Sequence, residues 1–382
     1  MITILVVRLY GDYTNAGNLA LAMNITNFFY CIANYNIRAY QVSDVNNEYS
    51  DSMYVVSRIV TCTGATLLCL VFVSFSGYSS GQVYIVMCYM VFRVIEAFVD
   101  ALHGIDQKHW RMDYVGISLI TRGILTLAAF IVLCQLLDLL LAIIGMVVVT
   151  AVVGLVYDYR KSKSLAMFSS WSVSQIFALL KRCFPLMIVI LIITFFASYS
   201  RYSLERIHGT EALGIYSSVI APTVLIQLAV AFMFTPLINL FSECIKESNW
   251  RRFIKIFIIS CVIITGFTLI GVFAAYLLGE WGLTILYSST IVPYVYLLPG
   301  AVVVTGLGAS LWFMNIVFTT IRDIKGIFYG CAVGIAVCIG TTDILLVRYG
   351  IVGANYVMLI SQGVAMLFLT VRLFLKWRKA NV

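Results

Sequence analysis

Two matching stretches, SYSRYSLERIHGTEALGIYSS at Ser198–Ser218 and VRLYGDYTNAGNLALA at Val7–Ala22, decide the expected fold. In each stretch an arginine and a tyrosine precede a polar turn that holds two glycines, and a long apolar run follows. The glycines are Gly11 and Gly17 in the first stretch and Gly209 and Gly214 in the second. A repeated pattern of this kind predicts an internal duplication, with one stretch near the start of each half.

The composition indicates a polytopic membrane protein. Hydrophobic residues make up 62% of the 382-residue chain and charged residues 11%, with a mean hydropathy of +0.99. An ordinary soluble domain has roughly 25% charged residues. Apolar runs of about 20 residues, the length that a helix needs to cross a bilayer, recur along the whole chain. The stretches between them are too short for a sizeable soluble domain.

We predict an all-α fold with about eleven full transmembrane helices and an N-terminal stub at Ile2–Val7. The predicted spans are Thr14–Asn34, Tyr54–Phe75, Val83–His103, Val115–Leu136, Leu139–Val156, Phe184–Ala197, Leu213–Phe234, Phe257–Leu278, Val292–Phe313, Ile327–Val347 and Ala354–Leu373. They divide into an N-terminal lobe at residues 1–168 and a C-terminal lobe at residues 184–382. Residues 169–183 are expected to form an amphipathic helix on the inner membrane surface that joins the lobes. The stub is too short to span a bilayer, which suggests a truncated gene or a misplaced start.

The loop charges orient these spans. With the C-terminal KWRKANV inside, the inner connections hold most of the lysines and arginines, and the opposite side keeps only Arg8, Arg201, Arg206 and Arg348. The positive-inside rule therefore predicts a cytoplasmic C-terminus. The net charge of +8 then reflects topology and contact with membrane lipid, and no nucleic acid partner is expected.

The sequence gives no sign of a cofactor or of catalysis. The ten cysteines lie mostly within apolar runs and show no CxxC or Cys/His metal spacing. We therefore expect neither disulfides nor a metal site. No motif of a hydrolase, a metalloprotease or a nucleotide-binding protein is present, so we expect a protein that is not an enzyme.

Charged side chains within the spans are the main candidates for a functional site, because they are costly in a bilayer. Arg93, Glu96 and Asp100 follow a three-or-four spacing that places them on one helix face, while Arg58 and Arg122 lie on neighbouring spans. The arginines are candidates for binding an anionic substrate, because a guanidinium matches phosphate or carboxylate oxygens. Glu96 and Asp100 are candidates for carrying a coupling ion. The structural alternative is that Arg93 and Glu96 neutralise each other and that Arg58 and Arg122 extend to the inner interface.

Several motifs resemble the oligosaccharide and O-antigen flippases (Wzx type) of the multidrug/oligosaccharidyl-lipid/polysaccharide (MOP) exporter superfamily. They are RAYQVSD at Arg38–Asp44, GIDQKHWRM at Gly104–Met112, and RYSLERIHGTEALGIYSS at Arg201–Ser218 followed by LAVAFMFTPLINLFSE. The resemblance implies two pseudo-symmetric six-helix lobes around a central cavity. It also implies transfer of a polyprenyl-pyrophosphate-linked oligosaccharide across the bacterial inner membrane by alternating access. Arg58, Arg93, Arg122 and Arg201 are then the expected substrate-binding residues, and a polysaccharide polymerase and other assembly proteins are expected partners.

Two other functions stay open. An ion-coupled small-molecule or multidrug exporter of the same superfamily would share this architecture. A membrane polysaccharide polymerase or ligase would need a large outer loop with catalytic groups, whereas the longest outer connection is the short one at Ser198–Ala212.

Overall fold

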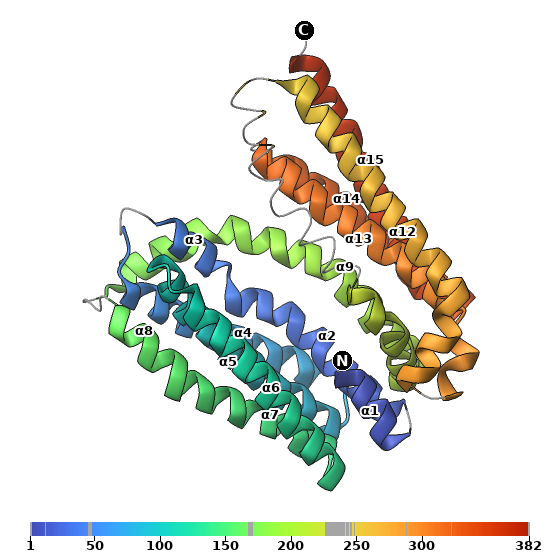
Figure 1. The fold of residues 1–382 in the computed structure, drawn as a ribbon, viewed down its shortest axis with the longest axis horizontal. Coiled ribbons are helices and arrows are strands. Elements are labelled where there is room, and N and C mark those ends of the chain that lie inside the picture. The colour runs from blue at the N-terminus through green and yellow to red at the C-terminus, as the bar shows by residue number, and fades with distance from the viewer. Residues whose placement is uncertain are drawn as a thin grey trace.

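The computed structural model is built of helices joined by short connections (Figure 1). It describes residues 2–11, 13–44, 48–166, 171–225, 241, 244, 247, 249–287, 289–321 and 323–380. The helices are α1 (Ile2–Tyr10), α2 (Thr14–Asn34), α3 (Ile37–Ser43), α4 (Asp51–Phe75), α5 (Ser80–Lys108), α6 (Met112–Leu136), α7 (Leu139–Val153), the π-helix η1 (Gly154–Tyr159), α8 (Arg160–Leu165), α9 (Val173–Ile220), η2 (Ala221–Thr223), α12 (Trp250–Tyr287), η3 (Ser289–Tyr294), α13 (Leu297–Thr320), α14 (Ile324–Tyr349) and α15 (Val352–Ala380).

The helices gather into two groups that converge at one end of the molecule (Figure 1). Helices α1–α8 form the first lobe, α12–α15 form the second, and α9 runs between them. Antiparallel contacts join α2 to α9: Asn24 Nδ2 donates to the carbonyl of Ser198 at 2.9 Å, and Cys31 Sγ lies 3.2 Å from Thr194 Oγ1. These contacts attach α9 to the first lobe along much of α2.

Most predicted spans coincide with helices of the structure. Helix α2 has the predicted bounds Thr14–Asn34, and the structure describes the span at Leu213–Phe234 only as far as residue 225. Eight helices of the described chain are long and apolar enough to cross a membrane. Helices α2 and α5 are outside this set: α2 contains five asparagines, and α5 carries three charged residues in its central part. The two helices that depart most from a purely apolar span are those that carry the candidate site.

The segment between the lobes differs from the separate surface helix expected at residues 169–183. Val173 begins α9, which continues through the predicted span at Phe184–Ala197. Ile176, Leu179 and Cys183 are buried, the last two beside Tyr54 of α4. Val173 and Phe177 stay exposed, so the segment packs on the first lobe along one side only, as the first turns of a long helix.

The two matching glycine stretches meet at the converging end. Helix α9 bends at Gly209, which has a φ of 84° and a ψ of 173°. A Cβ atom at Gly17 would overlap the carbonyl oxygen of Thr210, and a Cβ atom at Gly214 would overlap that of Tyr13. Gly214 follows Gly17 by 197 residues, and Thr210 follows Tyr13 by the same number. Each glycine therefore lies against the equivalent residue of the other stretch, as a pseudo-twofold relation between the duplicated stretches requires. We call this close approach of Gly17 and Gly214 the glycine crossing.

Polar contacts surround the glycine crossing and tie the lobes together. Gln82 Nε2 on α5 donates to Asn18 Oδ1 at 3.3 Å and to Thr210 Oγ1 at 3.0 Å. Tyr13 OH lies 3.2 Å from Thr290 Oγ1 in η3. These hydrogen bonds join residues far apart in the chain and close one end of the molecule. We call it the closed end.

At the other end of the second lobe, Asp323 ties α14 to α15. Arg372 Nε and Nη2 donate to its two carboxylate oxygens at 2.7 and 2.9 Å, and Lys376 Nζ lies at 3.1 Å. The hydrogen bonds from Arg372 lower the pKa of Asp323 from 3.8 to about 2. Its folded-state pKa is depressed, so its stabilisation is fully present above about pH 4 and is lost as the pH falls towards 2.

We expect Asp323→Asn to lower the stability of the protein at neutral pH by about 2 kcal/mol, at roughly 1.4 kcal/mol per pKa unit. Thermal unfolding in detergent would measure the effect, with Asp113→Asn as the control, because Asp113 pairs with Arg111 at an exposed site. The difference from the wild type should shrink below pH 4. A difference that stayed constant between pH 7 and 3 would contradict the assigned ion pair.

Candidate functional site

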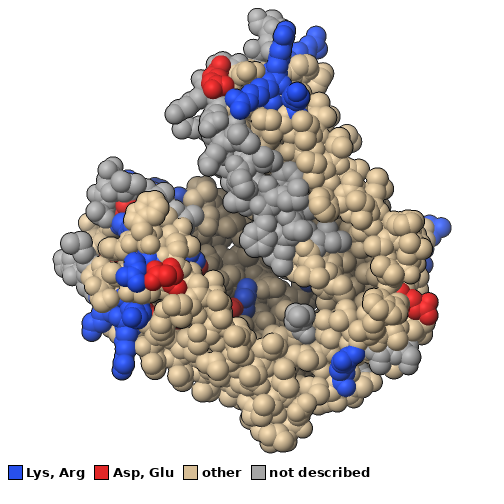
Figure 2. Space-filling view, viewed as in Figure 1, with Lys and Arg blue, Asp and Glu red and all other residues tan. Residues whose placement is uncertain are grey.

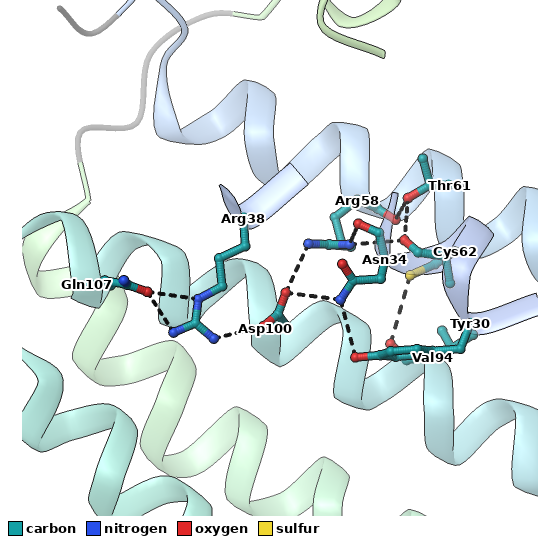
Figure 3. Close-up of polar contacts among 10 residues, drawn as sticks. Tyr30, Asn34, Arg38, Arg58, Thr61, Cys62, Val94, Asp100 and Gln107 are labelled. Carbon is teal, nitrogen blue, oxygen red and sulfur yellow. Dashed lines mark hydrogen bonds and ion pairs between the residues drawn. The ribbon is translucent and has the colours of Figure 1, made fainter. Parts of the chain in front are cut away.

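Polar side chains from α2, α3, α4 and α5 form a connected network inside the first lobe (Figure 3). Asp100 of α5 lies at its centre. Its Oδ1 accepts from Arg38 Nη1 at 2.9 Å, and its Oδ2 accepts from Arg58 Nη2 and from Asn34 Nδ2, both at 3.2 Å. Arg38 also donates two hydrogen bonds to Oε1 of Gln107, at 3.1 and 2.8 Å. Gln107 lies two helical turns after Asp100 on α5. With Asn27, Tyr30, Arg93 and Glu96, these residues make up what we call the first-lobe polar network.

Arg58 is the buried anchor of this network. The last carbonyls of a helix lack intrahelical partners, and Arg58 Nη1 donates to those of Ala33 (3.1 Å) and Asn34 at the end of α2. Thr61 Oγ1 donates to the Ala33 carbonyl as well, at 2.8 Å. The side chain of Arg58 has 0% exposure. Arg58 therefore extends to the end of α2 as a buried side chain, and in this conformation it has no surface to offer a substrate.

We expect Asp100→Asn to destabilise the first lobe, because it leaves the guanidinium of Arg58 buried without its carboxylate. Breaking a buried ion pair costs about 3–5 kcal/mol. We expect the lower end of this range, because the Asp100 side chain is 21% exposed and the carbonyls of α2 remain as acceptors. The fraction of folded protein after mild heating in detergent would measure the loss. Glu48→Gln, which removes an exposed partner of Arg182, is the matched control. Equal heat resistance of the two variants would contradict the buried pair.

Arg93 is the arginine of the network that is placed to meet a ligand. Its Nη1 donates to Glu96 Oε2 at 2.6 Å, its Nη2 donates to Asn27 Oδ1 at 3.0 Å, and its guanidinium lies 3.9 Å from the centre of the Tyr30 ring. The side chains of Arg93 and Glu96 are 21% and 30% exposed. Three neighbours thus fix the orientation of the guanidinium while part of it stays accessible. The predicted pairing of Arg93 with Glu96 is present, and it does not bury either group.

The two acidic residues differ in how far they are engaged. Asp100 contacts two arginines and an asparagine, whereas Glu96 contacts Arg93 alone among the hydrogen bonds and ion pairs of the described chain. Arg38, Arg58 and Arg93 face these two carboxylates, so the network carries a formal charge of +1. A surplus of positive charge favours an anionic ligand over a cationic one.

The space-filling view shows a deep hollow between the lobes (Figure 2). Basic and acidic side chains are visible in its depth. Lysines and arginines gather at the tips of the lobes, and fewer are visible at the closed end. The molecule is therefore closed at one end and hollowed towards the other.

The structure does not bring the remaining two candidate arginines into the network. Arg122 lies on α6, on the helix face that includes the buried Val115 and Ser118, and its Nε is buried without a hydrogen-bond partner in the described chain. Arg201 lies on α9 and lines a separate pocket of the second lobe. Substrate binding by Arg58, Arg93, Arg122 and Arg201 and ion coupling by Glu96 and Asp100 stay predictions.

Arg38 and Tyr30 are members of the network that sequence reasoning missed. Arg38 follows the span at Thr14–Asn34 and belongs to the RAYQVSD motif, and the short helix α3 returns it to α5. Tyr30 follows Asn27 and precedes Asn34 at helical spacing, and this polar stripe matches the one on α5. These two polar stripes on neighbouring spans are the signal that could have identified Tyr30.

The fold is that of the MOP superfamily transporters. The chain is similar to an inward-facing multidrug resistance MATE family transporter of this superfamily, with a TM-score of 0.77 and 12% identity over 100% of this chain and 94% of that one. It is also similar to the lipid II flippase MurJ in an inward closed conformation, with a TM-score of 0.79 and 12% identity over 97% of this chain and 84% of that one. An outward-facing MATE structure gives a TM-score of 0.61 at 13% identity, over 100% of this chain and 94% of that one. The conformation with one closed end is thus more similar to the inward-facing form than to the outward-facing one.

The sequence identifies the family. A model of the polysaccharide biosynthesis protein family matches residues 2–244, and the protein belongs to this family. A search of curated proteins gave no match. The resemblance derived from the sequence is confirmed at the level of family and fold, and the protein is a multi-pass membrane protein.

Proposed function

We propose that the protein is a flippase for a polyprenyl-pyrophosphate-linked oligosaccharide, the repeat unit of an O-antigen or another surface polysaccharide. The observation that carries this proposal is the partly exposed, oriented guanidinium of Arg93 within a network of charge +1. A pyrophosphate is an anion with oxygen atoms in the spacing that a guanidinium fork matches. Membership of a polysaccharide biosynthesis family supports a saccharide as the rest of the substrate.

The proposed mechanism is alternating access between two lobes. With the C-terminus cytoplasmic, as the loop charges favour, the closed end faces outward and the hollow faces the cytoplasm. The pyrophosphate would enter from the inner leaflet and meet Arg93, while the polyprenyl chain stays in lipid. Separation of the glycine crossing would then open the outer end. Binding free energy drives this change only if the substrate interacts differently with the two states.

This mechanism needs no bond to be made or broken, so the protein acts as a transporter and not as an enzyme. We place it in the bacterial inner membrane, with a polysaccharide polymerase and other assembly proteins as partners on the outer side. Its substrate and the surrounding membrane lipid are the ligands that the proposal requires.

A binding measurement tests the proposed headgroup. Purified protein should bind a fluorescent polyprenyl-pyrophosphate saccharide at least tenfold more tightly than the same saccharide on a polyprenyl alcohol, and added inorganic pyrophosphate should compete. Hydrogen bonds to charged groups contribute roughly 1.5–3 kcal/mol, which is about tenfold or more in affinity. Equal affinity for both lipids would contradict recognition of the pyrophosphate.

The second candidate function is an ion-coupled exporter of small molecules. The fold shared with multidrug transporters and the 30% exposure of the Glu96 side chain favour it. Such an exporter would expel a cationic dye from vesicles when a proton or sodium gradient is imposed, and Glu96→Gln would abolish this efflux. Dye efflux without transfer of the lipid-linked saccharide would replace the flippase proposal with this one.

A further inference from the structure

A polar pocket of about 140 Å³ lies between α9 and the second-lobe helices α13 and α15. Arg201 and Tyr216 of α9 line it from opposite sides of the bend at Gly209, and Thr305 and Gln362 line it from α13 and α15. The described chain contributes no carboxylate to its wall. Arg201 is therefore the one charged side chain among the residues that are described around this space.

Arg201 has no counterion in the part of the chain that the structure describes. Its side chain makes no hydrogen bond and no ion pair with those residues. The neighbouring hydroxyls have partners of their own, because Tyr216 OH donates to Asn355 Oδ1 at 3.0 Å and Thr305 Oγ1 donates to Thr223 Oγ1 at 2.8 Å. An unpaired guanidinium within a lobe of transmembrane helices is costly and normally faces a cavity with a partner in it.

Gln362 supplies a second, independent sign of a ligand. Its side chain is 6% exposed, and its Oε1 has no hydrogen-bond partner in the described chain. Buried amide groups are nearly always hydrogen-bonded. A cation and an unsatisfied amide thus face the same small space from two different helices.

The size of the pocket restricts what can fill it. A water molecule occupies roughly 30 Å³ in the liquid, so the pocket holds a few atoms of ligand together with water. Pockets for drug-sized ligands measure about 300–1,000 Å³. The pocket is smaller than these sites, and it can hold a small inorganic ion together with water.

We propose that this pocket binds one small inorganic anion, of the size of chloride or phosphate. Arg201 is its ion-pair partner, and a water molecule or a hydroxyl of the anion donates to Gln362 Oε1. The bound anion neutralises Arg201 and links α9 to α15. This site is separate from the first-lobe polar network and does not depend on the proposed flippase function.

Thermal unfolding of the full-length protein in detergent tests the site. Sodium chloride and sodium phosphate are each titrated against the bulkier organic salt sodium gluconate at constant ionic strength. A ligand that binds the folded state raises Tm with its concentration. We expect chloride or phosphate to raise the Tm of the wild type by several degrees, and we expect Arg201→Gln to lose this rise. Arg206→Gln should keep it, because Arg206 is an exposed residue on the same helix that pairs with Asp343.

Gln362→Leu provides a second test that leaves Arg201 in place. It should raise the anion concentration for half-maximal effect several-fold, and an unchanged midpoint would contradict the role of Gln362. The proposal as a whole fails if neither anion raises the wild-type Tm above the Tm measured in gluconate, or if Arg201→Gln responds like the wild type.

A last experiment adds a polyprenyl phosphate. If this lipid abolishes the response to free anions, the pocket takes a phosphate of a lipid and the proposal of a free inorganic anion is wrong.

Discussion

We expect Arg93→Ala to reduce transfer of a polyprenyl-pyrophosphate saccharide between leaflets by tenfold or more. The variant removes the accessible guanidinium that Glu96, Asn27 and Tyr30 orient. A hydrogen bond to a charged group contributes roughly 1.5–3 kcal/mol. Loss of the bond between Arg93 and the pyrophosphate during transfer should therefore lower the transfer rate by about tenfold or more. The initial rate of transfer in reconstituted vesicles, divided by the amount of folded protein, would measure the effect.

Two further variants show whether the loss of transfer in Arg93→Ala comes from the guanidinium itself. Arg93→Lys should restore transfer only in part, because lysine keeps the charge and loses the planar fork. Arg111→Ala removes an exposed arginine beside Asp113 outside the network and should leave transfer unchanged. Normal transfer by Arg93→Ala would exclude Arg93 as the residue that meets the pyrophosphate. Arg122→Ala extends the same test to Arg122, whose buried Nε has no hydrogen-bond partner in the described chain.

The second large effect is expected at the glycine crossing. In Gly17→Val the new side chain would overlap the carbonyl oxygen of Thr210, and a backbone atom cannot rotate away as a flexible side chain can. The closed end should therefore open, and transport should stop because one of the two alternating states is lost. Gly214→Val should act in the same way, because it meets the carbonyl of Tyr13.

Labelling of the closed end would measure this opening. In a background without the native cysteines, a single Gln82→Cys reports on the crossing, because Gln82 contacts Asn18 and Thr210. A membrane-impermeant maleimide should modify it several-fold faster when Gly17→Val is present. Gly64→Val is the control, because a Cβ atom at Gly64 meets no atom within 4 Å. Unchanged labelling in both glycine-crossing variants would contradict the role assigned to the crossing.

The sequence predicts the helices and the duplication well, because both depend on local patterns. Apolar runs of sufficient length predict the spans, and the bounds of α2 agree at both ends. The glycine pairs predicted the start of each half, and the structure adds that Gly17 and Gly214 lie against each other's stretch. A close approach between distant glycines depends on how the lobes dock, which no local pattern encodes.

The candidate site was only partly predictable. Helical spacing placed Arg93, Glu96 and Asp100 on one face, and the structure joins them through Tyr30 and Asn34. Spacing could not distinguish the buried Arg58, which binds carbonyls at the end of α2, from the partly exposed Arg93. That distinction depends on where α2 ends and turns: Tyr35 and Asn36 have φ values of 49° and 52°.

The same limit applies to the connection between the lobes. The apolar spacing of Val173, Ile176 and Leu180 fits a helix on the membrane surface as well as the first turns of α9. The structure shows that the segment is continuous with α9 and that Leu179 and Cys183 cluster with Tyr54, a contact between residues far apart in the chain.

Transfer of a fluorescent polyprenyl-pyrophosphate saccharide across reconstituted vesicles tests the central claim most directly. Purified protein is inserted into vesicles that carry the labelled lipid in both leaflets, and a membrane-impermeant reagent quenches the label on the outside. We predict that a further fraction of the label becomes accessible over time with the wild type, and much more slowly with Arg93→Ala. Transfer by the wild type no faster than in vesicles without protein would contradict the proposed flippase.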